Sequence, residues 1–362
     1  MLEKFLMTRR EVSFRYWQLL LVLAAFALLV VGFGAGVHRA ITKPDRAGPF
    51  AKSALAVARI PVDAKTVLKA LSGRSHPARS GQQRFSGQSG FQRFAPATGE
   101  EGLLLLSRFD GDRQRGIVEV LDLRDGSVLH TYSVDEAKIH ATTKARIPWV
   151  DPQTDKDRSR FFLSHPVATP EGGLVFHGMY TPLVKIDACS RIEWIADDIF
   201  HHAIEPAEDG GFYTASVLYP ATIRGQSDTF ADDAIVKVSA DGEVLWKRSV
   251  AQIAIASGLK HQALVPAGRK DDPFHLNDVQ PVTDDGPHWQ KGDLLLSLRH
   301  PSSVWLYRPS TDQLVWHQEG HWMMQHDVDV IDDHRISVFD NNTAQLRSGE
   351  KSSAQIMPSS ST

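Results

Sequence analysis

The stretch GDLLLSLRHPSSVWLYRPSTDQLVWH, residues 292–317, shows the unit that decides the fold. A short apolar strand comes first, a turn follows, and a second strand ends near Trp316. Short apolar runs separated by Gly, Pro, Asp and Ser are typical of small antiparallel sheets. The stretch therefore predicts a few short strands joined by tight turns.

The same layout returns earlier in the chain, with turns such as Asp125-Gly126 and Asp241-Gly242, in the segments 101–132, 172–195 and 234–247. The second strand carries a tryptophan at matching places in three copies: Trp194, Trp246 and Trp316. His130 takes that place in the first copy. We expect the tryptophans to be core residues between repeats and give them no functional role.

A unit of about four short strands every ~40–50 residues is typical of a β-propeller blade, which buries its faces against its neighbours. The predicted fold class is all-β, a β-propeller over 99–342. Four copies are clear and a fifth begins at His326, but the polar tail 343–362 has no strand signal. We therefore expect an incomplete ring, in a chain truncated at its C-terminus.

The run WQLLLVLAAFALLVVGFGAGV, residues 17–37, contains no charged residue and is long enough to span a bilayer. We predict a cytoplasmic segment 1–16, a transmembrane signal-anchor 17–37 and a stalk 38–98 that includes a flexible linker over 74–90. The propeller is expected on the extracytoplasmic side of a bacterial inner membrane. A cleaved signal peptide is the alternative, and it also exports the rest of the chain.

Composition excludes some classes of protein. The net charge of −3 makes nucleic acid an unsuitable partner. The single cysteine, Cys189, excludes an internal disulfide framework and a multi-cysteine metal site. The composition gives no indication of the oligomeric state.

Three polar segments precede or begin strands: FHHAIEPAEDGG (200–211), FHLNDVQPV (274–282) and QHDVDVI (325–331). Inner strands of a propeller line a central channel, so these side chains can converge from distant blades. Arg299, followed by His300, interrupts another apolar strand. Such residues can be structural, but these segments share a place without sharing residue identities, which favours chemistry. No short-range ligand spacing indicates a metal, and no cofactor is expected, although zinc or calcium ligation by the channel residues stays open.

Taken in this order, the segments resemble the bacterial arylsulfotransferase family, whose members need no nucleotide sulfate donor. The resemblance covers about residues 99–342. It implies a six-bladed periplasmic propeller that transfers a sulfuryl group from a phenolic sulfate to a phenolic acceptor through a sulfohistidine. It implies that His326 is the nucleophile and that His275, Arg299 and either His202 or His201 are catalytic, with Asn277 in substrate binding. The register favours His202 over His201.

Two features depart from the family: Ala203 stands where an acidic residue is common, and the sequence that completes the ring is missing after 342. The chemistry is nevertheless coherent. A neutral imidazole is a good nucleophile near pH 7, and an arginine fork can hold the sulfuryl oxygens. His275 or His202 can protonate the leaving phenolate, while Asn277 holds a sulfate oxygen or orients an imidazole. A non-catalytic propeller that binds a ligand or a protein is the main alternative, and a different channel enzyme, such as a metal-dependent hydrolase, is another.

Overall fold

The computed structural model describes residues 16–42, 47–71, 90–94, 102–110, 112–113, 115–152, 161–163, 165–264, 271–342 and 353–358. The chain divides into two compact units, Met1–Ser86 and Gly87–Thr362. Each unit is described by itself below.

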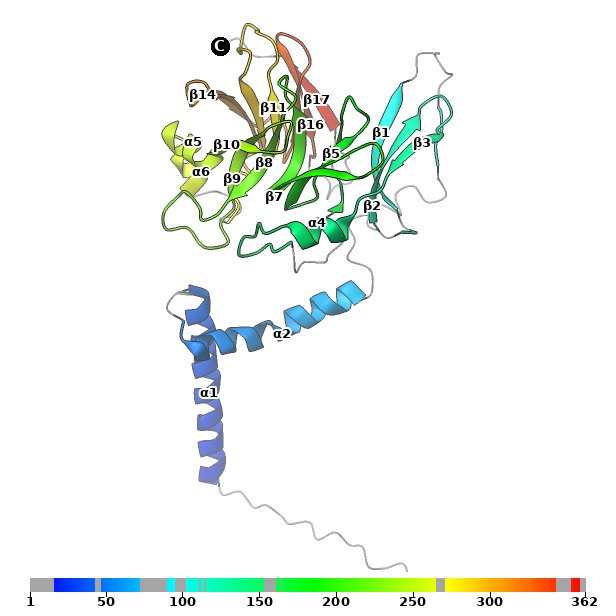
Figure 1. Ribbon diagram of the computed structural model, residues 1–362. Coiled ribbons are helices and arrows are strands. Elements are labelled where there is room, and N and C mark those ends of the chain that lie inside the picture. Colours follow the sequence, from blue (N-terminus) through cyan, green and yellow to red (C-terminus); the bar gives the residue numbers. More distant parts are fainter. Residues whose placement is uncertain are drawn as a thin grey trace, which may run out of the picture. The chain divides into compact units, whose positions relative to one another are not determined.

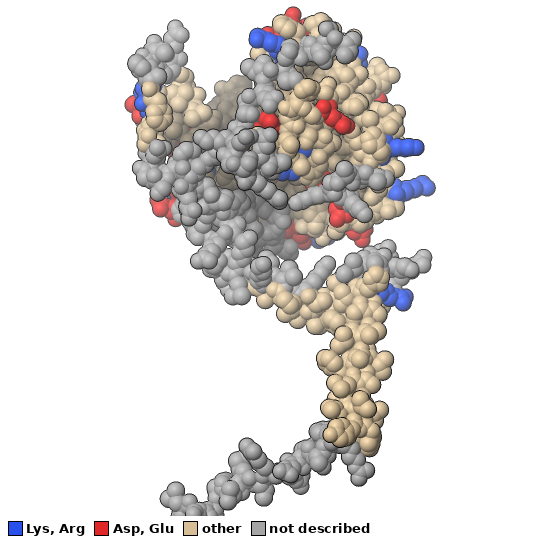
Figure 2. Space-filling model, turned by 180° about the vertical axis from the view of Figure 1, so that it is seen from behind, with Lys and Arg blue, Asp and Glu red and all other residues tan. Residues whose placement is uncertain are grey.

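The N-terminal unit contains two helices, α1 (Tyr16–Thr42) and α2 (Pro49–Leu71) (Figure 1). Tyr16–Ala40 is long and apolar enough to cross a membrane, a property that it shares with signal sequences. Figure 2 shows most of this helix as a column of uncharged side chains; Arg39 lies in its last turn. The two helices approach closely at Gly36, where a Cβ atom would lie 2.9 Å from the ring of Phe50. The predicted helix over 17–37 is confirmed, and the linker predicted over 74–90 lies almost wholly outside the described residues.

The larger unit is built from antiparallel strands. The strands are β1 (Leu103–Asp110), β2 (Arg115–Asp122), β3 (Val128–Tyr132), β4 (Val167–Ala168), β5 (Leu174–Phe176), β6 (Thr181–Ile186), β7 (Ile192–Pro206), β8 (Phe212–Leu218), β9 (Asp232–Val238), β10 (Val244–Ser249), β11 (Leu276–Pro281), β12 (Leu294–Leu298), β13 (Ser303–Arg308), β14 (Gln313–Glu319), β15 (His326–Val330), β16 (Arg335–Asp340) and β17 (Ser353–Pro358). Three short helices accompany them: α4 (Glu136–Thr142), α5 (Val250–Ala256) and α6 (Lys260–Leu264). These helices were not predicted in the sequence analysis.

Strand β7 belongs to two blades. The part that begins at Ile192 pairs with β6, and the part that begins at Phe200 pairs with β8. The seven-stranded sheet β4 to β10 is therefore two blades joined through one long strand. In the part of the chain that the structure describes, the strands form five blades: β1–β3, β4–β7, β7–β10, β11–β14 and β15–β17.

Alternate residues of a strand face different neighbouring blades, as a propeller requires. Leu174 and Phe176 of β5 lie in a buried cluster with Val118 of blade 1. Val175, between them, lies in a different cluster with Val236 of blade 3. Because both faces of a blade are covered, its middle strands are apolar on both sides.

The leucine run that opened the sequence analysis follows the same rule. The even-numbered leucines of β12 share a buried cluster with Ile235 of blade 3. Leu295 shares another cluster with Val338 of blade 5. The predicted β-propeller is confirmed by this pattern of cores between consecutive blades.

The tryptophans have the predicted place. Trp194, Trp246 and Trp316 are each partly buried, and each packs against a different cluster between blades. Their regular recurrence therefore reflects blade packing.

Two predicted boundaries need correction. The propeller unit begins upstream of residue 99: Phe91 lies against Gly126, and the Arg93 guanidinium donates a hydrogen bond to the Leu123 carbonyl of blade 1. The tail 343–362, predicted to lack strands, contributes β17, which pairs along β16. An edge strand has unpaired backbone N–H and C=O groups, and pairing with them depends on the backbone more than on the side chains. A polar segment can therefore form β17.

Candidate active site

The predicted site residues lie where inner strands are bulged. The pairing register shifts next to His201 in β7, at Leu276 in β11 and at His326 in β15. At or beside these places, His202 and His275 have φ values of 67° and 53°. A bulge with a left-handed residue turns a side chain away from the regular alternation, and such bulges are frequent next to active sites.

The bulges bring three imidazole rings together from three blades. The ring centroids of His202 and His275 lie 4.8 Å apart, and those of His202 and His326 lie 5.9 Å apart. His202, Asn277 and His326 line a cavity of about 460 Å³, whose other lining residues are His165, Ala203, Asp327, Phe339 and Asn341.

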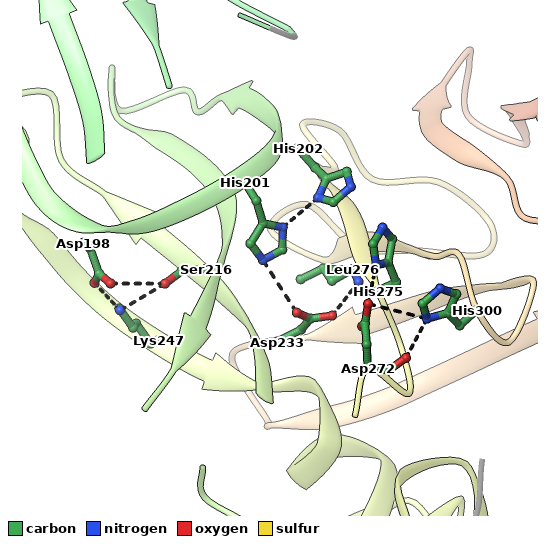
Figure 3. A network of polar contacts seen from close by, with 10 residues as sticks. All are labelled: Asp198, His201, His202, Ser216, Asp233, Lys247, Asp272, His275, Leu276 and His300. Carbon is green, nitrogen blue, oxygen red and sulfur yellow. Dashed lines mark hydrogen bonds and ion pairs between the residues drawn. The ribbon is translucent and has the colours of Figure 1, made fainter. Parts of the chain in front are cut away.

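His201 lies behind His202. Only 1 % of His201 is exposed, and its Nδ1 atom lies 2.7 Å from Nδ1 of His202 (Figure 3). Its Nε2 atom lies 3.6 Å from a carboxylate oxygen of Asp233. Of the two candidates that the sequence left open, His202 lines the cavity and His201 supports it from the buried side.

Asp272 was not predicted, yet it organises two histidines. Nδ1 of His275 donates to the Asp272 carboxylate at 2.6 Å, and Nδ1 of His300 donates to the Asp272 backbone carbonyl, also at 2.6 Å (Figure 3). Burial opposes the charge on Asp272, but the hydrogen bond and the charges of the nearby histidines lower its pKa overall. This bond fixes the tautomer of neutral His275 with its lone pair on Nε2. The signal in the sequence was an aspartate three residues before the histidine.

Arg299 joins this group through its backbone and its charge. Its N–H donates to the His275 carbonyl at 3.2 Å. Its positive charge is one of the influences that lower the pKa values of His326 and His300. Arg299 is therefore joined to His275 through the backbone, and its charge acts on two histidines of this group.

Asn277 is fixed by its neighbour Gln325. The Asn277 side-chain nitrogen donates to the Gln325 backbone carbonyl at 2.8 Å. Gln325 is itself fully buried, and its side-chain nitrogen donates to the carbonyls of Leu298 and Ser303 on the adjacent blade. A carbonyl oxygen can only accept a hydrogen bond, so the atom of Asn277 that faces Gln325 must be the amide nitrogen. This fixes the orientation of the Asn277 amide, and its Oδ1 atom takes no part in the contact.

Among the described residues, Asn277 Oδ1 is buried without a hydrogen-bond partner. An amide oxygen accepts hydrogen bonds, so it cannot hold a sulfate oxygen. Of the two roles expected from the sequence, this geometry supports orienting an imidazole N–H, or accepting a phenolic O–H.

His326 is kept neutral. Burial, and then the nearby His275 and Arg299, lower its pKa to about 4. Nδ1 lies 2.7 Å from the side-chain amide of Asn341, at the end of the same hairpin. A neutral ring at pH 7 has a lone pair that can attack an electrophile.

One wall of the cavity region is acidic. Burial, and then repulsion from Asp278, Asp327 and Asp329, raises the pKa of Glu205 to about 9. Burial also raises the pKa of Asp278 to about 8. His165 lies beside them, with Nδ1 3.4 Å from a Glu205 oxygen. The sequence analysis did not identify this group, because its members come from four blades.

These carboxyl groups predict a loss of stability between pH 7 and pH 9. Folded Glu205 holds its proton up to about pH 9, whereas the unfolded residue loses it near 4.5. The folded state thus binds more protons, and stability falls by up to about 1.4 kcal/mol per pH unit for one such group. The buried histidines, with lowered pKa values, have the opposite effect but only below about pH 6.5. Thermal unfolding in a chelating buffer at pH 7, 8 and 9 checks this, and Glu205→Gln should flatten the decline.

Comparison with known proteins gives one family. The sequence profile of a family described as Arylsulfotransferase (ASST) matches residues 181–360, which contain all the predicted site residues. No curated protein sequence matches the chain.

Solved structures with similar coordinates are distant in sequence. BamB from Moraxella catarrhalis is 12 % identical with a TM-score of 0.36, covering 66 % of this chain and 51 % of its own. A protein of unknown function from Bacteroides caccae is 14 % identical with a TM-score of 0.40, covering 67 % and 66 %. The WD40 β-propeller domain of Doa1 is 12 % identical with a TM-score of 0.39, covering 66 % and 57 %. The chain thus spans about half to two thirds of the length of these structures.

Proposed function

Residues 181–360 of this chain belong to the arylsulfotransferase family, and from this premise we propose that the protein transfers a sulfuryl group from a phenolic sulfate to a phenol. The observation that carries the proposal is the meeting of His202, His275 and His326 beside Arg299, next to one cavity. A neutral nucleophile, a proton carrier and a cation for the sulfuryl oxygens are the groups that such a transfer needs.

In the first half-reaction, a ring nitrogen of His326 attacks the sulfur atom. The N–S bond forms as the S–O(aryl) bond breaks, giving sulfohistidine and a phenolate. Because Nδ1 contacts Asn341, Nε2 is the available nitrogen. Attack by Nε2 needs the proton on Nδ1, and Asn341 accepts it through its oxygen when the amide turns by 180°.

Sulfuryl transfer should resemble phosphoryl transfer, with charge spread over the peripheral oxygens. Arg299 stabilises that charge. Protonated His275, with Nδ1 bonded to Asp272, donates the Nε2 proton to the departing phenolate. The Asp272 carboxylate holds the Nδ1–H of His275, which leaves Nε2 as the atom that carries this proton.

In the second half-reaction, an acceptor phenol occupies the place of the first. Neutral His275 removes its proton, and the phenolic oxygen attacks the sulfur of sulfohistidine. The N–S bond breaks and returns His326 to its neutral form. Protons and charge balance over the cycle without a further reactant.

Incubation with 4-nitrophenyl sulfate tests the proposal. Without an acceptor, 4-nitrophenol release should stop near one equivalent per active site, and a labile +80 Da adduct should map to the peptide containing His326. Adding a phenol should restore turnover and yield the sulfated phenol. A protein that neither releases 4-nitrophenol nor forms an adduct would instead be a ligand-binding propeller.

The proton donor should matter most for poor leaving groups. We expect Asp272→Asn and His275→Ala each to lower kcat/KM for phenyl sulfate by about 10²–10⁴-fold. The loss should be much smaller for 4-nitrophenyl sulfate, whose phenolate needs less help from an acid. Measuring both substrates for each variant checks this, and an equal loss for both would assign these residues a structural role instead.

We propose that α1 anchors the protein in a membrane, with the propeller on the extracytoplasmic side. The apolar run 17–37 supports this placement. Alkaline phosphatase works only after export, so fusing it after residue 95 should give an active reporter in bacteria. An inactive fusion, together with an active cytoplasmic reporter at the same position, would reverse the proposed topology.

A further inference from the structure

The proposed sulfuryl transfer does not use the acidic residues near the cavity, which are Glu205, Asp278, Asp327 and Asp329, or the neighbouring His165. His165 precedes β4, Glu205 lies near the end of β7, and Asp327 follows His326 in β15. One ligand-type atom from each lies within 4.8 Å of the other two. Imidazole nitrogen and carboxylate oxygen atoms this close, brought from three blades, have the spacing of a small coordination sphere.

We propose that His165, Glu205 and Asp327 bind a divalent transition-metal ion. The Nδ1 atom of His165 faces a Glu205 oxygen at 3.4 Å and accepts the Ile204 backbone N–H at 3.3 Å. A metal ion bound to Nδ1 would replace this long hydrogen bond. Ca²⁺ and Mg²⁺ prefer oxygen ligands alone, whereas one imidazole with two carboxylates suits Zn²⁺ or Mn²⁺.

The orphaned oxygen of Asn277 is a second, independent observation. Asn277 is 2 % exposed, and its Oδ1 atom lacks a partner among the residues that the structure describes. It lines the same cavity as His165 and Asp327. A buried acceptor without a partner, on a residue that lines this cavity, can accept a hydrogen bond from a water molecule bound to a cation.

The surrounding charge favours a cation as well. Asp278 is almost fully buried, and its two oxygens accept the backbone N–H groups of Val279 and Val328. It is therefore held in place near Glu205, and both of its oxygens are already engaged. Asp329 contributes further repulsion on Glu205. A divalent ion would offset this repulsion and link three blades at the channel.

The proposal does not depend on sulfuryl transfer, because binding can be measured without an aryl sulfate. The full-length protein in detergent is stripped with a chelator and titrated with Zn²⁺ or Mn²⁺ alone by calorimetry. We expect about one ion per chain. At 100 times the Kd, the thermal midpoint should rise by about 5–10 °C.

Substitution identifies the ligands. Glu205→Gln and Asp327→Asn keep the shapes of the side chains and should each weaken binding about 100-fold, with the loss of the thermal shift. Using both variants guards against a folding defect in one. The matched control is Asp333→Asn, in the exposed group Asp332, Asp333 and His334 on the β15–β16 turn, and it should bind as the parent does.

Three outcomes overturn the proposal. The parent protein binds neither ion, both ligand variants bind as tightly as the parent, or the control variant alone loses binding. Tighter binding of Ca²⁺ than of Zn²⁺ and Mn²⁺ would overturn the assignment to a transition metal.

Discussion

Replacing His326 with alanine is expected to abolish the burst of phenol release, the +80 Da adduct and steady turnover. Among the described residues, His326 combines a lowered pKa with a place on the cavity wall and a supporting contact from Asn341. Without it, the sulfuryl group has no carrier, and direct transfer between two phenols would need both in the cavity at once. We expect turnover to fall by about 10⁴-fold or more. Release of 4-nitrophenol, with mass spectrometry of the quenched protein, measures both effects.

The matched control is His334→Ala. His334 lies in the turn of the same hairpin, where its side chain is 55 % exposed, and it should have no effect on turnover. A +80 Da adduct that persists in His326→Ala and maps to His202 or His275 would leave the family intact but give the nucleophile to another ring. An unchanged burst without any adduct would exclude covalent catalysis.

Replacing Arg299 with lysine should lower kcat/KM by about 2–4 kcal/mol in transition-state free energy, a factor of about 30 to 1000. One ammonium group cannot reproduce the planar fork that holds two sulfuryl oxygens. The fold should survive, because the backbone N–H of residue 299, which bonds to the His275 carbonyl, is unchanged.

Replacing Arg299 with glutamine removes the positive charge. This variant should also raise the pKa of His326 toward its ordinary value, because Arg299, after burial and His275, is one of the causes that lower it. The pH profile of the burst rate therefore separates two roles of Arg299, which are holding the sulfuryl oxygens and lowering the pKa of His326. If the burst rate falls and the acidic side of its pH profile also shifts, the positive charge of Arg299 lies close to His326. The control is Arg335→Lys, at an exposed position where the new side chain retains a charge beside Asp332. Equal effects at positions 299 and 335 would contradict the assignment.

Much of the fold could be predicted because the deciding signals are local. Apolar runs between turn residues gave the short strands, and recurring tryptophans gave the blades. The division of β7 between two blades was not foreseen, since a bend within one strand has no turn residue to mark it. Strand β17 was missed because its partner strand, rather than its own composition, specifies it.

The sequence predicted a set of candidate site residues but not how they are arranged. His202, His275, Arg299 and His326 were singled out by polar residues in apolar surroundings. Asp272 was missed because its role depends on one hydrogen bond to His275. The choice between His201 and His202 needed the bulge in β7, which decides the ring that lines the cavity.

The sequence by itself determined the apolar N-terminal helix, the repeated blade and the identity of the histidines. These are properties of periodicity and composition, which are visible in short stretches of chain. Only the tertiary structure decided which residues of different blades meet: the Asn277 amide with the Gln325 carbonyl, and the trio of His165, Glu205 and Asp327. Their proximity arises from packing whole blades against one another, so residues more than a hundred positions apart in the chain become neighbours, and no local spacing encodes that.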